Sequence, residues 1–210
     1  MFKYYKFTLI HLALFTSLFA FVGFFYTHNK EILSKQDALF YYVNASGKQR
    51  VLAQRIIYLS QNILTNVILK KENHHNFIEL RSCINGLLSI NTMLQGFIIS
   101  ETSDKSTTTL DDIYFGGGNL AVKIDEFLNT ANRLFYVKDI QELLNINQKL
   151  LEGLESKEGL LASLELATLS QQIYGQNQVK RLEQLSYFLL CVVILFIIAE
   201  CLLIFIQRKK

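Results

Sequence analysis

The sequence predicts an all-α protein in which two transmembrane helices flank an extracytoplasmic up-down-up-down four-helix bundle. Two apolar runs, residues 7–26 and 187–206, are each 20 residues long. At about 1.5 Å per residue, each run can cross a hydrocarbon core of about 30 Å. The chain has no proline and ten glycines in 210 residues, which favours long helices. Between the runs, apolar residues recur at alternating steps of three and four, the spacing of one helix face.

The two apolar runs divide the chain into segments. The first run is longer than the apolar core of a signal peptide, and no small-residue cleavage site follows it, so we expect an uncleaved anchor. Basic residues flank the runs on their outer sides: Lys3, Lys6, Arg208, Lys209 and Lys210. Because Lys and Arg are enriched in cytoplasmic flanks, both termini are predicted to be cytoplasmic. The predicted segments are a tail (1–6), a transmembrane helix (7–26), a domain outside the membrane (27–186), a second transmembrane helix (187–206) and a basic tail (207–210).

The domain outside the membrane is near neutral, since it contains 16 Lys and Arg against 17 Asp and Glu. A nucleic-acid-binding domain presents a basic surface, so we expect no nucleic-acid partner. Of the three cysteines, Cys83 alone lies in this domain, which excludes a disulfide within one copy of it. Cys83 is either a buried free thiol or a bridge between subunits.

Four helices are predicted in this domain. The first, roughly 34–69, has a seam of Leu39, Val43, Ser46, Arg50, Ala53, Ile57, Ser60, Leu64 and Val67. The second follows Asn73, a residue type favoured at the N-cap, and buries positions from Phe77 to Ile98. The third has a seam of Leu120, Ile124, Phe127, Ala131 and Leu134, and a loop at 101–118 (ETSDKSTTTLDDIYFGGG) precedes it. The fourth begins near Asp139 and is expected to continue without a break into the second span.

Arg50 is unexpected in the seam of the first helix, because such a seam normally faces another helix. Two interpretations follow. Arg50 either binds a ligand, an anion above all, or pairs with an acidic residue or with carbonyl groups inside the bundle and sets the register of its helices. At about 100° per residue, Gly47, Arg50 and Gln54 lie within roughly 60° of one another, whereas Arg55 points well away.

The stretch that contains Arg50, VNASGKQRVLAQRI (43–56), resembles the N-A-G-x-Q-R-M-L-S-Q-R-I motif of the PilJ-type sensor domain. That domain is the N-terminal part of type IV pili methyl-accepting chemotaxis transducers. More loosely, the stretch is similar to the nitrate-recognition motif of NarX- and NarQ-type kinases. Residues 112–134 (DIYFGGGNLAVKIDEFLNTANRL) and 171–185 (QQIYGQNQVKRLEQL) resemble two further PilJ-type segments in the same order.

The resemblance implies a periplasmic four-helix bundle in the bacterial inner membrane that dimerises along its first helix and transmits signals across the membrane. In the nitrate-binding relatives, the first arginine of the motif and its dimer mate hold one anion. The matching residue is Arg50, with Asn44 and Gly47 at neighbouring motif positions. Arg55 matches the second motif arginine and Gln54 precedes it. From the helical wheel, Arg55 is expected to be structural or solvated.

The chain departs from the family pattern in two places. Gly116, Gly117 and Gly118 stand where family members often have prolines, and no Gly-Lys-Ser/Thr follows that would make them a phosphate loop. Four residues follow the second span, too few for an output domain. We therefore expect either a truncated gene or a subunit that acts through a separate signalling protein.

Ionisable residues inside the spans are His11 and Glu200, at similar depths. They either form a hydrogen bond within or between chains, or remain apart, with snorkelling or a protonated Glu200. His74 and His75, with Glu79 nearby, supply too few ligands for a metal site, so solvated histidines are expected. No nucleophile–base pair or carboxylate dyad points to an enzyme, and no cofactor is expected.

These observations favour a membrane-anchored sensor subunit. It is expected to be a homodimer that binds a small, nitrate-like anion near Arg50 and moves its membrane helices in response. The alternative is a non-sensing, membrane-anchored helical scaffold that docks a protein partner.

Overall fold

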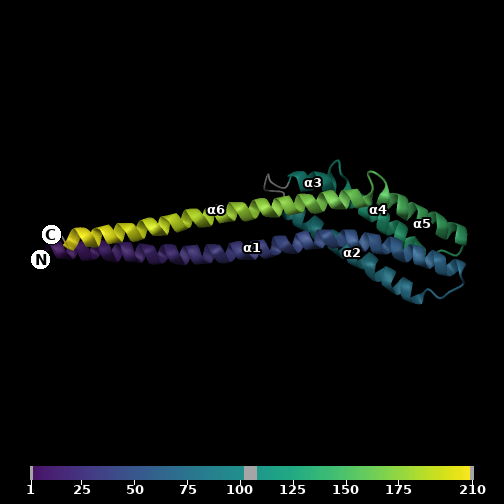
Figure 1. The fold of residues 1–210 in the computed structure, drawn as a ribbon, viewed down its shortest axis with the longest axis horizontal. Helices are drawn as coiled ribbons and strands as arrows, with labels where there is room; N and C mark the ends of the chain where they lie inside the picture. Colours follow the sequence, from purple (N-terminus) through teal and green to yellow (C-terminus); the bar gives the residue numbers. More distant parts are fainter. Residues whose placement is uncertain (1, 102–107, 209–210) are drawn as a thin grey trace. The chain divides into compact units, whose positions relative to one another are not determined.

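The computed structural model describes residues 2–101 and 108–208, without the side chains of 2–10, 31, 35, 101, 108, 207 and 208. The basic flanks Lys3, Lys6, Arg208, Lys209 and Lys210, used above to predict orientation, have their side chains outside the described part. The described residues contain no strand, which confirms the all-α class (Figure 1). Their helices are α1 (Phe2–Ile68), α2 (His74–Glu101), α3 (Thr108–Phe115), α4 (Leu120–Asn132), the 3-10 helix η2 (Arg133–Phe135), α5 (Ile140–Glu155) and α6 (Leu160–Arg208).

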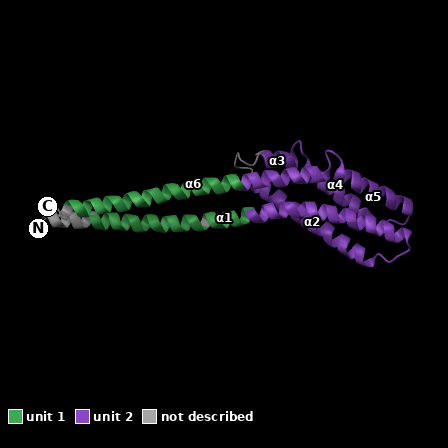
Figure 2. Ribbon diagram, viewed as in Figure 1, with its two compact units in different colours: residues 1–39, 176–210 green, residues 40–175 purple. Residues whose placement is uncertain are grey.

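The chain forms two compact units, coloured separately in Figure 2. Unit 1 contains residues 1–39 and 176–210, and unit 2 contains Phe40–Gly175. α1 and α6 each contribute residues to both units, whereas α2 to α5 belong to unit 2. The boundaries between the two units reflect packing within the chain. The predicted ends of the transmembrane helices, at residues 26 and 187, describe where the chain meets the bilayer and stay predictions.

Unit 1 is an antiparallel pair of helices from α1 and α6. Nδ1 of His11 and Oε2 of Glu200 form a hydrogen bond at 2.8 Å, and the rings of Phe21 and Phe196 lie 6.2 Å apart between centroids. Large apolar side chains such as Phe19 are exposed on the outside of the pair. An apolar exterior of this kind suits a hydrocarbon environment.

By length and composition, three stretches of the described chain are apolar enough to cross a membrane: His11–Ile68, His74–Ser100 and Ile140–Ile206. The first and last contain the predicted spans and are compatible with a membrane location. The second, which was not predicted, is α2. Within unit 2, α2 buries Leu80, Leu87 and Leu94 completely, so its apolar composition serves the bundle core.

The core of unit 2 is built on the predicted seams, except on the first helix. There Ser46, Ala53, Ile57 and Ser60 of the predicted seam are buried, whereas Leu39, Val43, Arg50, Leu64 and Val67 are half-buried, because the inward face of α1 lies beside that seam. Every member of the third seam is buried: Leu120, Ile124, Phe127, Ala131 and Leu134. α4 packs against α2, α3 and α5. The first helix ends at Ile68, close to the predicted position, and α2 begins directly after Asn73 as predicted. The Asn73 amide links the two helix ends, because its Nδ2 donates to the Ile63 carbonyl at 3.3 Å.

Part of the predicted loop at 101–118 is helical, so that prediction is wrong for the described residues 108–115. These residues form α3, in which Leu110, Ile113 and Tyr114 are buried. The spacing of three and four residues lets one face of this short helix pack into the core. Sequence reasoning missed it because polar Ser, Thr and Asp residues surround these apolar positions.

The predicted continuous fourth helix is also wrong. α5 ends at Glu155 and α6 begins at Leu160, with a four-residue link (156–159) between them. Ser156 leaves the helical conformation at φ −59° and ψ 158°. Leu160 is buried directly after the link, and Leu164 and Gln171 are buried further along α6.

We predict opposite effects for alanine at two glycines beside this link. A Cβ on Gly159 would lie 2.6 Å from the Leu154 carbonyl oxygen, whereas one on Gly153, in α5, meets nothing within 4 Å. Gly159→Ala should lower the free energy of unfolding by about 1–3 kcal/mol through overpacking. Gly153→Ala, the control, should raise it by about 0.5–1 kcal/mol. Unfolding of the full chain in detergent, followed by circular dichroism, measures both free energies. Equal changes in the two variants would contradict the close contacts predicted at Gly159.

Candidate functional site

Within unit 2, α1 presents three faces. The inward face buries Ala45, Gln49, Ala53, Ile56 and Ile63 in the core. A lateral face contacts α6, where the hydroxyl groups of Ser46 and Thr168 hydrogen-bond at 3.0 Å. The outward stripe steps by four and three residues through Phe40, Asn44, Gly47, Val51, Gln54 and Tyr58. Arg50 lies at the border between the lateral face and the outward stripe.

Arg50 has one weak partner among the described residues. Its Nη1 lies 3.8 Å from Oε1 of Glu165 on α6, and their side chains are 42% and 69% exposed. This distance is too long for a hydrogen bond. Exposed ion pairs typically contribute about 0–1 kcal/mol, so the guanidinium can exchange Glu165 for another anion at low cost. The structural interpretation expected an acidic partner inside the bundle. Glu165 is acidic but exposed, so the contact leaves both interpretations of Arg50 open.

Three other predicted ligand residues lie on the outward stripe beside Arg50. Asn44 and Gln54 are exposed, and Gly47 lies between them. A Cβ built on Gly47 meets nothing within 4 Å, so this glycine leaves open space on the helix surface. The structure therefore places Arg50, Asn44, Gly47 and Gln54 on adjoining parts of one surface.

Arg55, the fifth predicted ligand residue, lies across the outward stripe from Arg50, about 140° around the helix. Its Nε donates to Oε1 of Glu79 on α2 at 2.7 Å, and its guanidinium lies 4.8 Å from the ring centroid of Tyr58. The hydrogen bond with Glu79 raises the pKa of Arg55. These contacts give Arg55 a role in joining α1 to α2. Cys83, on the same helix as Glu79, is buried and free, and burial raises the pKa of its thiol.

Sequence reasoning missed a group of buried polar residues behind Arg50. Gln49 is fully buried, and its Oε1 accepts a hydrogen bond from the Tyr114 hydroxyl on α3 at 3.2 Å. Burial raises the pKa of the Tyr114 phenol well above its usual range. Asn91 and Gln171 are buried as well. Both are polar residues at positions where the helix spacing predicts apolar ones, and this pattern could have indicated a buried polar group.

The remaining ionisable residues considered in the sequence do not add to the surface around Arg50. His11 and Glu200 contact each other in unit 1, as described above. His74 and His75 are exposed, and Glu79 is engaged by Arg55. The described ranges contain no group of three or more His, Cys, Asp or Glu residues placed to hold a metal ion.

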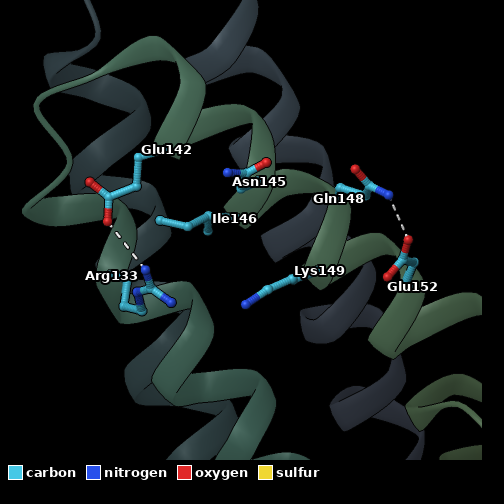
Figure 3. Close-up of a pocket in the computed structure, with 7 residues that line it drawn as sticks. All are labelled: Arg133, Glu142, Asn145, Ile146, Gln148, Lys149 and Glu152. Carbon is cyan, nitrogen blue, oxygen red and sulfur yellow. Dashed lines mark hydrogen bonds and ion pairs between the residues drawn. The ribbon is translucent and has the colours of Figure 1, made fainter.

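A surface cavity of about 290 Å³ lies along α5 (Figure 3). Arg133 pairs with Glu142 at 3.2 Å on one side, and Gln148 donates to Glu152 at 2.8 Å on the other. Lys149 extends into the space between these pairs. Because the charged groups are exposed and largely matched with one another, the cavity is a solvated surface feature.

The surface around Arg50 is thus the part of unit 2 where predicted ligand residues converge. Comparisons of the chain with protein-family models, with curated proteins and with solved structures find no match. The function of the chain is therefore inferred from the geometry of this surface and from the chemistry of its residues.

We predict that Tyr114 makes folding stability sensitive to alkaline pH. The unfolded phenol ionises near pH 10, and burial holds the folded phenol neutral at higher pH. Its contribution is thus complete below pH 10 and declines above it, by about 1.4 kcal/mol per pH unit. Denaturant unfolding of the full chain between pH 8 and 11 should show a steeper decline in the wild type than in Tyr114→Phe, which keeps only the contribution of other groups such as the Cys83 thiol.

The matched control is Tyr136→Phe, since the Tyr136 side chain is exposed. This variant should retain the wild-type decline. At neutral pH, Tyr114→Phe should cost about 1–3 kcal/mol, because it leaves the Gln49 oxygen buried without its partner. A wild-type pH profile that matches Tyr114→Phe would contradict the burial of this phenol.

Proposed function

We propose that the chain is a membrane-anchored sensor subunit of the PilJ-like kind. In this proposal, residues 27–186 form a periplasmic four-helix bundle between two transmembrane helices of the bacterial inner membrane, with both termini cytoplasmic. Two copies associate along α1 and bind a small, nitrate-like anion between their Arg50 side chains. The observation that carries the proposal is a weakly paired, accessible arginine beside an exposed apolar stripe on the same helix.

The outward stripe of α1 supports association of two copies. Phe40, Val51 and Tyr58 are each at least half exposed, although they are large and apolar or aromatic. The residues of the outward stripe recur at steps of four and three, which is the spacing by which paired helices bury a seam. Gly47, in the middle of the stripe, lets a second helix approach closely. A second copy of α1 would cover these residues and bring the two Arg50 side chains close together.

An anion would stabilise that arrangement. Two guanidinium groups about 6 Å apart repel by roughly 3 kcal/mol at an effective dielectric near 20. A planar anion between them removes the repulsion and accepts bidentate hydrogen bonds. The ligand therefore binds most tightly to the geometry that brings the first helices together, and this difference in affinity shifts the population of the dimer.

The signal would pass along α1 and α6, which each contribute residues to both units. Arg50 on α1 and Glu165 on α6 face each other, so an anion that draws Arg50 away loosens one contact between the two helices. A separate signalling protein would read the resulting change in the membrane helices.

A docking scaffold is the second candidate. Leu166, Leu169 and Ile173 form another exposed stripe, on α6. If these residues bind a protein partner, the bundle needs no ligand. Anion titration separates the two candidates, since a scaffold would be inert to anions.

We predict that anion binding depends on Arg50. Isothermal titration of the full chain in nanodiscs with nitrate, nitrite and acetate should detect binding of at least one of them. Charge-assisted hydrogen bonds contribute about 1.5–3 kcal/mol, so Arg50→Ala should weaken affinity by about 10-fold or more. Arg55→Ala is the control and should bind normally, because Arg55 faces Glu79. Equal affinity of wild type and Arg50→Ala would remove the proposed site.

We also predict that the outward stripe of α1 lies at the dimer axis. In a background that lacks the native cysteines, Val51→Cys should form an intermolecular disulfide under mild oxidation. Such a bond needs Cα atoms within about 7 Å. Leu144→Cys, on an exposed part of α5, is the control and should stay monomeric on a non-reducing gel. Cross-linking at Leu144 and not at Val51 would place the interface elsewhere.

A further inference from the structure

Four polar side chains from four helices occupy the core of unit 2. Gln49 on α1, Asn91 on α2, Tyr114 on α3 and Gln171 on α6 are each at most 2% exposed. We call these four residues the core polar layer. Three of them belong to the three sequence segments that resemble the PilJ-type pattern, 43–56, 112–134 and 171–185.

Contacts on either side of Gln49 bring the layer together. Tyr42 stacks on Phe97 with centroids 3.9 Å apart, and Leu52 lies beside Gly86, so antiparallel α1 and α2 place Asn91 near the level of Gln49. Ser46 bonds to Thr168 at 3.0 Å and Val43 lies beside Gly175, so antiparallel α1 and α6 place Gln171 one to two helical turns from Gln49 along the bundle. Tyr114 contacts Gln49 directly.

Four atoms of the layer have no hydrogen-bonding partner among the described residues: Gln49 Nε2, Asn91 Oδ1, Gln171 Nε2 and Gln171 Oε1. Nearly all buried polar atoms in native proteins are paired with protein or with ordered water. Asn147, another buried amide of this bundle, follows that rule. It donates to the Leu143 carbonyl at 3.0 Å and accepts from Ser60 at 2.9 Å. The unpartnered atoms are thus a property of the layer, and not of every polar residue in the core.

The layer is suited to an uncharged ligand. Its unpartnered atoms include amide nitrogens, which donate, and amide oxygens, which accept. No charged side chain that the structure describes is buried, and Arg50 and Glu165 face each other outside the core. An ion in the layer would lose its hydration without an opposite charge beside it, which is unfavourable.

We propose that the core polar layer binds small uncharged molecules that both donate and accept hydrogen bonds. Buried water and a small primary amide share this chemistry. A primary amide has two N–H donors and two acceptor lone pairs, which matches the two nitrogens and two oxygens left without partners. The site is distinct from the surface near Arg50, because the successive residues Gln49 and Arg50 point about 100° apart on α1.

Selective ¹⁵N labelling of Asn and Gln in the full chain in nanodiscs tests the proposal. Magnetisation exchange between side-chain amide protons and water should give cross-peaks at Gln49 and Gln171. Added acetamide is the second arm, and its methyl protons should give cross-peaks to the same amides if the site accepts a primary amide. The paired amide of Asn147 is the control and should show neither. Cross-peaks to water alone identify water as the occupant.

The absence of both kinds of cross-peak at Gln49 and Gln171 would overturn the proposal. Gln171→Leu tests whether the layer is one site. If one bound molecule contacts both glutamines, loss of the Gln171 amide should reduce the cross-peak at Gln49 at least twofold. An unchanged Gln49 cross-peak in this variant would show separate sites and would also overturn the shared layer. If Gln171→Leu does not fold, the wild-type measurement decides. Anion titration at Arg50 is independent of either outcome.

Discussion

The burial of the inward face of α1 is the constraint on which the rest of unit 2 depends. Each neighbouring helix is attached to this face or its border by a specific contact: Tyr42–Phe97 to α2, Gln49–Tyr114 to α3, Ser60–Asn147 to α5 and Ser46–Thr168 to α6. Small residues there, Ala45, Ser46 and Ala53, let the neighbours approach closely. Because those contacts occupy the inward and lateral faces, the opposite stripe of α1 is left exposed.

Because the inward face of α1 is buried, the two arginines of one motif contact different neighbouring helices. Arg50 and Arg55 are five residues apart, about 140° around the helix. Arg55 therefore reaches Glu79 on α2 with a short hydrogen bond, while Arg50 reaches Glu165 on α6 over a longer distance. The same residue type thus joins two helices at one position and is exposed with a weak partner at the other.

Much of the helical core was predictable because burial on a helix repeats locally. The seam from Leu120 to Leu134 needed no knowledge of its neighbours, and the end of α1 near Ile68 coincided with a polar stretch. α3 and the link after Glu155 were not predictable in this way. The burial of Tyr114 depends on α1, which is distant in sequence. The apolar seam crosses the link, since Leu154 before it and Leu164 after it are both buried, so the spacing gave no sign of a break. The seam spacing predicted that Arg50 faces another helix, whereas the structure places it at a face border, with a partner, Glu165, that was not predicted.

The link at 156–159 gives the long helices unequal mechanical properties. α1 has no comparable interruption between Phe40 and Ile68, whereas α6 is uncoupled from the torsion of α5 at its first residue. Lys123 on α4 bridges this joint, since its Nζ donates to the Glu158 carbonyl and to the Ser163 hydroxyl, both at 3.0 Å. Lys123 therefore adds to the contacts that resist a twist of α6 about its own axis, such as Ser46–Thr168, and the helical backbone of α5 is not bound to follow such a twist.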